Sequence, residues 1–531
     1  MPRSEENIAV HQNERFFARR RSSLLSPPPS PSQFSLKSPR CRRPSITLVN
    51  PTTMIKTIRI GNLRSNNVVA AAENNIPNEN KVDNKTVGLK LLEARKDSSV
   101  NELYLCGIEF NQVTVDAVNR LFDRDTHYFR RWKTIKLISC SGMVSDVLKA
   151  VLSCEKVEAL VVSGNHTDLP SLQVINDNMK TNTTLRKLKL LGVPFVLEEH
   201  TDDEIEEKDP HFFEWLESNT TLRDLDLSRS HLALEAVQSL STAMQTNTTL
   251  ESLQLEECML QDECLSKIIT GITNHTALKH LNLSHNSSNT LAMNAIAELM
   301  SNTSNSNNNC IETLNLSTQI LVHPEHDVLD EIALAKAIAV VAGSSCSPTL
   351  KVLDVSGNCF SDAAVQLLTT ALSQNTTLET LRINDSKISQ AGIQLLAHKL
   401  PELSTSLKTL DISGNDVYSP EAQQALVDGL QHNRTLTSFG AMTPEEDDEE
   451  NEAPVAVDPM VQHYLDLNLA GRRAMQDDIP LAAWPQLLTR VNNMMEQEED
   501  EEEEEEEKFD AASRQANMLF ALLRGPALFE R

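Results

Sequence analysis

Residues 246–258 read TNTTLESLQLEEC, and two similar phrases stand upstream, TNTTLRKLKLLGV at 181–193 and SNTTLRDLDLSRS at 218–230. When the first apolar residue of each phrase is used as an anchor, related phrases recur along the chain, most often 28 or 29 residues apart. A period of this length predicts one small unit stacked many times, because a single unit cannot bury its own apolar face. The anchors are Val100, Trp132, Val157, Leu185, Leu222, Leu250, Leu278, Ile311, Leu350, Leu378, Leu407 and Leu436.

Each unit combines a strand pattern with a helix pattern. In LKHLNLSHN at 278–286, the alternation of Leu281 and Leu283 places both side chains on one face of an extended segment, which we expect to be the core side. The apolar period then changes to about 3.6 residues, which predicts an amphipathic helix. Two units show clear helical stripes, formed by Ala364, Leu367, Leu368, Ala371 and Leu372 and by Leu265, Ile268, Ile269 and Ile272.

Asparagine recurs at two positions of the unit. At the ninth place of the frame, we expect it to hydrogen-bond the backbone of neighbouring units, since unpaired buried backbone groups are costly. A second set follows the helices, where we expect the left-handed conformation that Asn tolerates. The ninth-place residues are Asn165, Asn286, Asn358 and Asn415, with Cys140, Cys258, Ser230 and Ser386 in equivalent places, and the second set is Asn182, Asn219, Asn247 and Asn375.

Charge and cysteine usage bound the class of protein. The chain has 531 residues and a formal net charge of −27, and the acidic segments 445–452 and 496–507 hold 18 of its 75 acidic residues. Such runs are predicted to stay solvated or to contact a basic partner. The nine cysteines are scattered without a C-x-x-C pair, which predicts reduced thiols and a cytoplasmic or nuclear location. No apolar stretch approaches the roughly 18 residues of a membrane span.

The N-terminal segment differs from the rest of the chain in composition. It is basic and rich in Ser and Pro, which predicts disorder. Ser22, Ser23 and Ser45 lie beside arginines and are candidate phosphorylation sites, where a phosphate would cancel local positive charge.

These patterns predict five regions. They are a disordered segment at 1–52, an N-terminal cap region at 53–99, an array of about 11 repeats at 100–440, an acidic linker at 441–460, and a C-terminal helical segment at 461–531 that a polyglutamate loop interrupts at 496–508.

The frames that begin at Leu278, Leu350 and Leu407 read Leu-x-x-Leu-x-Leu-x-x-Asn. With the helical halves, about two thirds of the chain resembles the ribonuclease-inhibitor-like subfamily of leucine-rich repeat proteins. That resemblance implies an α/β solenoid with a parallel sheet on the concave face, helices on the convex face, and protein binding. The C-terminal segment is similar to that of many algal and diatom repeat proteins. An array followed by an acidic segment also resembles Ran GTPase-activating proteins.

The sequence contains none of the motifs that carry common chemistry. It has no phosphate-binding G-x-x-x-x-G-K-[ST], no G-x-S-x-G elbow, no H-E-x-x-H helix and no paired metal-ligand cysteines. The HPEH cluster at 323–326 is interpreted as a solvated loop. We therefore expect no enzyme activity, no cofactor and no metal site, and the missing basic stripe argues against nucleic-acid binding.

The candidate partner-binding positions are the polar residues between the strand leucines, on the face away from the core. One column across the units is predicted to be exposed, either as a binding face or as a solvated surface. We hypothesise a monomeric protein-interaction scaffold whose partner is basic or a small GTPase. The alternatives are a GTPase regulator and an adaptor that acts through the C-terminal helices. The candidate residues are Tyr104, Asp226, Gln254, Asn282, Asp354, Arg382 and Asp411.

Overall fold

The computed structural model describes the central part of the chain, all of it within one compact unit, residues 55–531. Ser22, Ser23, Ser45, the anchor Val100 and the polyglutamate loop lie outside the described residues. So do Asn165, the HPEH cluster, residues 441–457 and most of the regions 53–99 and 461–531. The described residues are 57–61, 101–122, 132–164, 169–195, 212–288, 290–301, 310–319, 336, 339, 349–403, 406–417, 419–440 and 458–469.

A parallel sheet of 13 strands runs through this unit, with one strand from nearly every repeat lying beside the strand of the next. In sheet order the strands are β1 (Thr57–Gly61), β2 (Glu102–Cys106), β4 (Thr134–Ile138), β6 (Ala159–Ser163), β7 (Lys187–Leu191), β9 (Asp224–Asp226), β11 (Ser252–Gln254), β12 (His280–Asn282), β13 (Thr313–Asn315), β14 (Val352–Asp354), β15 (Thr380–Arg382), β16 (Thr409–Asp411) and β17 (Ser438–Gly440).

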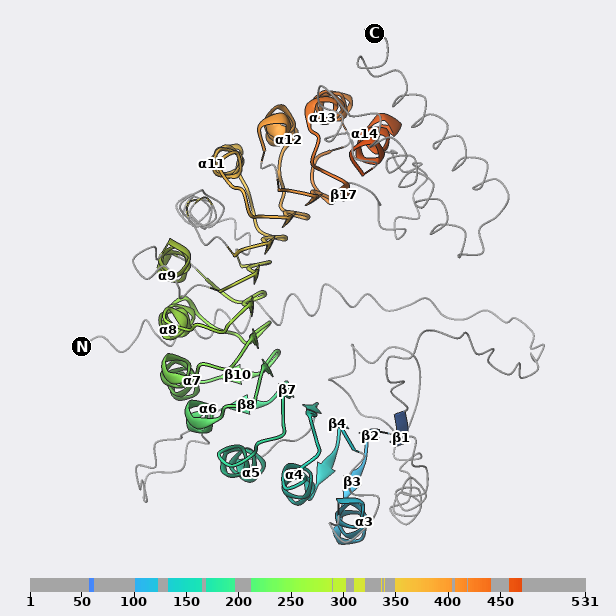
Figure 1. Cartoon of the computed structure of the whole chain (residues 1–531), viewed down its shortest axis with the longest axis vertical. Helices are drawn as coiled ribbons and strands as arrows, with labels where there is room; N and C mark the ends of the chain where they lie inside the picture. The colour runs from blue at the N-terminus through green and yellow to red at the C-terminus, as the bar shows by residue number, and fades with distance from the viewer. Residues whose placement is uncertain are drawn as a thin grey trace, which may run out of the picture. The chain divides into compact units, whose positions relative to one another are not determined.

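Helices follow the strands and cover one side of the sheet. In this unit they line the outer side of a curved array, and the strands line its inner side (Figure 1). Two short parallel pairs, β3 (Glu109–Phe110) with β5 (Ser141–Gly142) and β8 (Pro194–Phe195) with β10 (His231–Leu232), join neighbouring turns. The helices are α3 (Gln112–Phe122), α4 (Val144–Leu152), α5 (Leu169–Met179), α6 (Glu214–Ser218), α7 (Leu234–Thr246), α8 (Asp262–Ile272), α9 (Thr290–Ser301), α11 (Asp362–Leu372), α12 (Gln390–Lys399), the 3₁₀ turn η3 (Leu400–Glu402), α13 (Pro420–His432) and α14 (Pro459–Leu469).

The core lies between the sheet and the helices. Every described anchor, from Trp132 to Leu436, is buried, as are Leu281 and Leu283. All four apolar residues of the predicted stripe in α8 are buried as well. In α11 the prediction was wrong for Leu367, which is 37 % exposed, because the buried stripe is rotated toward Val365. The predicted strand, turn and helix unit is therefore confirmed, with one helix rotated about its axis.

The ninth-place residues join neighbouring units as expected. Asn286 Nδ2 donates to the carbonyl of Leu255 at 2.8 Å, and its Oδ1 accepts from the backbone N–H groups of Cys258 and Leu260. Cys258 donates its thiol hydrogen to the carbonyl of Leu227 at 3.1 Å. Amides and thiols thus satisfy buried backbone groups in adjacent turns of the array.

The asparagines after the helices act differently from the prediction. Asn219 and Asn247 are extended, with φ of −75° and −65°, so the left-handed explanation is wrong. Asn182 and Asn375 also have no positive φ. The Asn247 Oδ1 accepts from the N–H groups of Thr249 and Leu250, and its Nδ2 donates to the Leu216 carbonyl at 2.7 Å. Asn is used here because its amide bonds backbone groups in both its own unit and the preceding one.

Candidate partner-binding surface

The strand register brings the predicted binding residues into one row. Asp226 is paired with Gln254, Gln254 with Asn282, and Asp354 with Arg382. The row continues through Asn315 to Asp411, and Asp411 is paired in turn with Gly440 of β17. We call this row the inner column, and it consists of Tyr104, Lys136, Val161, Lys189, Asp226, Gln254, Asn282, Asn315, Asp354, Arg382 and Asp411.

Four members of this column, Lys136, Val161, Lys189 and Asn315, were not among the predicted residues. Lys136, Val161 and Lys189 connect Tyr104 to Asp226 across β4, β6 and β7. The sequence KLKLL at 187–191 already indicated that Lys189 belongs to the column, because Lys189 stands between two core leucines. The long spacing between the anchors Leu185 and Leu222 concealed that continuity.

Short side chains of the inner column stabilise the ends of their own strands. Asp226 Oδ1 accepts from the backbone N–H of Ser228 at 3.1 Å, and Asp411 Oδ1 does the same with Ser413 at 3.1 Å. Asn282, Asn315 and Asp354 each accept in the same way from the serine two residues on. The Asp or Asn at this position is therefore explained in part by a local turn, a role that sequence reasoning missed.

Some charged side chains of the inner column also form ion pairs with each other. Lys189 Nζ lies 2.8 Å from Asp226 Oδ2, and Arg382 lies 3.6 Å from Asp354 Oδ2. Burial opposes the charged form of Lys189, but its hydrogen bond to Asp226 and the attraction of nearby carboxylates raise the pKa of the ammonium group.

Exposure differs along the column. Asp226 is only 7 % exposed, so the prediction that it presents an exposed side chain was wrong. Its two oxygens are engaged by Ser228 and Lys189, and both partners cover it. Arg382 is exposed, whereas Tyr104, Gln254, Asn282, Asp354 and Asp411 are half-buried. Arg382 is the member of the predicted set that a partner reaches most readily.

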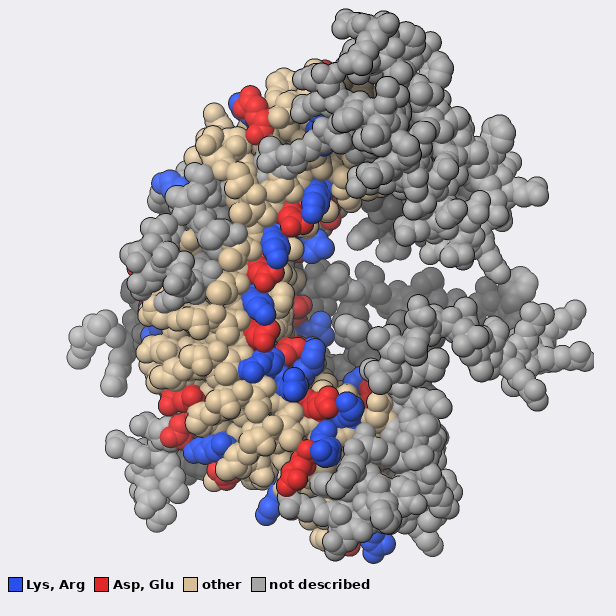
Figure 2. All heavy atoms as spheres, viewed as in Figure 1, with Lys and Arg blue, Asp and Glu red and all other residues tan. Residues whose placement is uncertain are grey.

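A second row runs along the edge where the strands begin. Its members stand one residue before each strand of the 13-stranded sheet from β4 to β16. Figure 2 shows basic and acidic side chains alternating along the array. Neighbours pair across the row, for example Lys279 with Glu251 at 2.9 Å and Lys408 with Glu379 at 2.7 Å. We call it the edge row, and it consists of Lys133, Glu158, Arg186, Arg223, Glu251, Lys279, Glu312, Lys351, Glu379 and Lys408.

The described residues contain no group of three or more His, Cys, Asp or Glu side chains arranged to hold a metal ion. Among them there is also no helix long and apolar enough to cross a membrane.

Comparison with known proteins agrees with the repeat architecture. The profile of the Leucine Rich repeat family matches residues 218–241, 346–368, 374–397 and 403–417. No curated protein matches the sequence. Together with the parallel sheet and its flanking helices, the profile matches establish an α/β leucine-rich repeat fold.

The solved structures that are similar to the chain include the following two. One is leiomodin-1 actin-binding site 2, at 14 % identity and a TM-score of 0.25, covering 34 % of this chain and 90 % of that one. The other is a complex of Rad7 and Elc1 in yeast, at 14 % identity and a TM-score of 0.35, covering 68 % of this chain and 74 % of that one.

Proposed function

We propose that the protein is a non-catalytic interaction scaffold that binds a protein partner along the inner column. The observation that carries this proposal is the unbroken register from Tyr104 to Arg382 and Asp411. Leucine-rich repeats are commonly used for protein binding, and stacked units present long concave surfaces for it. The inner column offers a partner one polar position from each successive strand.

The chemistry of the column favours a partner with mixed polar groups. Gln254 and Asn282 carry amides that both donate and accept, and Arg382 carries an exposed guanidinium group. Arg is common at the centres of protein interfaces because its planar group forms several hydrogen bonds at once. We expect such contacts to decide specificity, while the buried Asp226 holds the surface in shape.

The setting that we propose is inside the cell. Cys106, Cys258, Cys264 and Cys310 carry free thiols, as expected for the cytoplasm or nucleus. We also propose that the scaffold is monomeric and needs no cofactor.

The test is partner capture by the full-length protein, followed by mass spectrometry, with matched surface variants. Gln254→Arg and Asn282→Arg place bulky cations on the inner face. Gln366→Arg makes the same change on an exposed position of α11, on the outer side of the array. We expect to find partner proteins that are captured by the Gln366→Arg variant but not by Gln254→Arg or Asn282→Arg. Equal capture by all three variants would remove the inner column as the binding surface.

Two other functions are separated by further measurements. Faster GTP hydrolysis by a panel of small GTPases in the presence of the protein would replace the scaffold proposal with GTPase regulation. An adaptor acting through the C-terminal segment predicts capture that is insensitive to Gln254→Arg. The described part of that segment, α14, packs on α13 with Val461 and Leu465 buried, so α14 is engaged by the array itself.

A further inference from the structure

The edge row alternates in charge except at one place. Arg186 and Arg223 are neighbours in the row, so two cations stand side by side where the pattern calls for a cation and an anion. The carboxylate of Glu158, on the other side of Arg186, is held by Lys133 at 3.1 Å. Arg223 reaches Glu251 at 3.5 Å and the Thr249 carbonyl at 2.9 Å.

Arg186 has no anionic partner in the part of the chain that the structure describes. Within the described ranges, its side chain has no ion pair and no hydrogen bond, and the residue is exposed. Its backbone, by contrast, is held by the Glu158 carbonyl at 2.8 Å. Every other cation of the edge row has a carboxylate within 4 Å. The missing partner is therefore specific to this one position and is not a general feature of the row.

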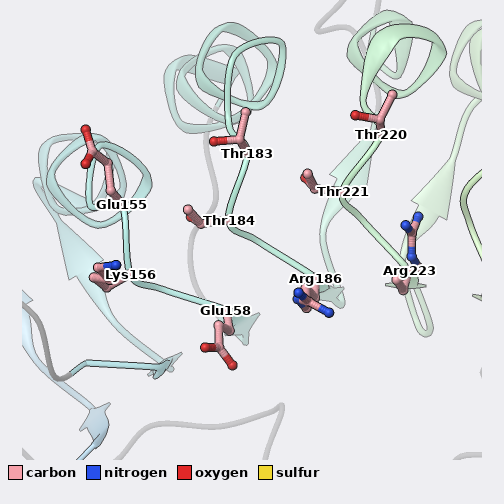
Figure 3. A pocket seen from close by; sticks show the side chains of 9 residues that line it. All are labelled: Glu155, Lys156, Glu158, Thr183, Thr184, Arg186, Thr220, Thr221 and Arg223. Carbon is pink, nitrogen blue, oxygen red and sulfur yellow. The ribbon is translucent and has the colours of Figure 1, made fainter.

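A hollow of about 310 Å³ opens at the same place. It lies between three successive repeats, and Figure 3 shows the side chains that surround it. The lining is polar throughout. It consists of Glu155, Lys156, Glu158, Thr183, Thr184, Arg186, Thr220, Thr221 and Arg223.

The hydroxyl groups of the lining add hydrogen-bond donors. In the next repeat, Thr221 Oγ1 donates to the Asn182 carbonyl at 3.3 Å. The equivalent hydroxyl of Thr184 is shielded from solvent and has no hydrogen-bond partner among the described residues. The exposed threonines of the lining, Thr183 and Thr220, are the ones whose hydroxyl groups a ligand in the hollow can reach.

We propose that this hollow, the edge pocket, binds an oxyanion carried by a peptide segment of a partner protein. The group is either the carboxylate of an acidic side chain or the phosphate of a phosphorylated one. Arg186 forms the charge-assisted contact, with Lys156 and the threonine hydroxyls around it. The planar guanidinium matches both oxyanions in a bidentate geometry, which an ammonium group does not.

The edge pocket is distinct from the inner column. Its residues precede the strands, whereas the inner column lies within them. Binding there does not require the scaffold proposal, because an oxyanion site at the edge can act with or without a partner on the inner face. The chain as a whole is strongly acidic, so recognition has to come from short-range contacts and not from the long-range field.

Isothermal titration calorimetry of the full-length protein at low salt tests the proposal. The probes are inorganic phosphate and three peptides that differ at one central residue, which is glutamate, phosphoserine or glutamine. The variant is Arg186→Gln. The control is Lys408→Gln, which removes the same charge from the same row at an exposed position where Glu379 already supplies the partner.

We expect the glutamate or the phosphoserine peptide to bind more tightly than the glutamine peptide. Arg186→Gln should weaken that binding about tenfold or more, whereas Lys408→Gln should leave it unchanged. The tighter of the two charged peptides identifies the source of the oxyanion. Equal weakening by both variants would show non-specific attraction and overturn the proposal. If inorganic phosphate binds but neither charged peptide does, the proposal that a peptide carries the oxyanion is overturned. If none of the probes binds, the proposed site is overturned.

Discussion

The side chain of Asn468 in α14 donates from Nδ2 to the backbone carbonyl of Asn433 at 3.1 Å. It also donates to the carbonyl of Leu436 at 2.9 Å. Asn433 makes the same kind of bond to the Leu400 carbonyl in the preceding unit. The row of asparagines that links the repeats thus continues one step past the last strand. Terminal units of a repeat array need a cover for their apolar face, and α14 supplies one.

Replacing Asn468 by alanine is expected to loosen this end of the array. The change leaves two buried carbonyls without their donor, which costs about 1–3 kcal/mol. Hydrogen exchange measured by mass spectrometry should show faster exchange in α13 and β17, with little change near β2, because end units open independently of distant ones. Gln462→Ala, at an exposed position of α14, is the matched control. Unchanged exchange in α13 would show that α14 does not stabilise the last repeat.

His275 takes the position that Asn247 occupies in the preceding unit. Its Nδ1 accepts from the backbone N–H groups of Ala277 at 3.3 Å and Leu278 at 3.1 Å, so the ring must be neutral at that nitrogen. Burial lowers the pKa of His275 from 6.5 to about 4. In the unfolded chain the imidazole ring is protonated near its ordinary pKa, whereas in the folded chain it is protonated only at lower pH.

Stability should therefore fall as the pH drops from about 6.5 toward 4, and level off below the folded-state pKa. The loss attributable to this one group is on the order of 3 kcal/mol. His275→Asn restores the amide found in neighbouring units and should remove that part of the pH dependence. The measurement is urea denaturation of both proteins across this pH range. Parallel curves for the two proteins would mean that His275 does not report on folding.

Much of the fold follows from periodicity alone. Leu250 and Leu278 are separated by one full unit, and a leucine that must point into the same core at each turn leaves a clear signal. Helix rotation is less well specified. Val365 and Leu367 are both apolar and flank the stripe of Ala364, Leu368 and Leu372 on opposite sides of it, so only packing against the adjacent helices decides which one is buried.

The candidate surface was predictable in position but not in chemistry. Alternation along β9 and β15 placed Asp226 and Arg382 in one row, as the register confirms. The alternation could not show that Asp226 is buried. The residue that covers it, Lys189, lies 37 residues upstream, and residues 196–211 separate the two strands in the sequence. The sequence also could not show that Arg186 lacks an anionic partner among the described residues, because that becomes visible only when the strands are aligned in space.

Thiol reactivity should separate the cysteines by position. Burial raises the pKa of Cys258 to about 12 and that of Cys140 to about 11, so neither forms a thiolate near neutral pH. Cys106 and Cys310 are only half-buried. Alkylation of the native protein by iodoacetamide, mapped by mass spectrometry, should label Cys106 and Cys310 first. Cys140 and Cys258 should react only after denaturation, and early labelling of Cys258 would contradict its placement in the core.

Asp226 should prove structural when it is substituted. Asp226→Ala removes the acceptor of the Ser228 N–H and hydroxyl groups and leaves the half-buried Lys189 without its carboxylate. The expected loss is about 2–4 kcal/mol in the free energy of unfolding, measured by urea denaturation. Asp226→Asn keeps the turn acceptor and loses only the charge, so it should cost less. Asp411→Ala removes a comparable turn contact where no lysine depends on it, and it serves as the control. If Asp226→Ala and Asp411→Ala lower stability equally, the ion pair with Lys189 contributes nothing measurable to the free energy of unfolding.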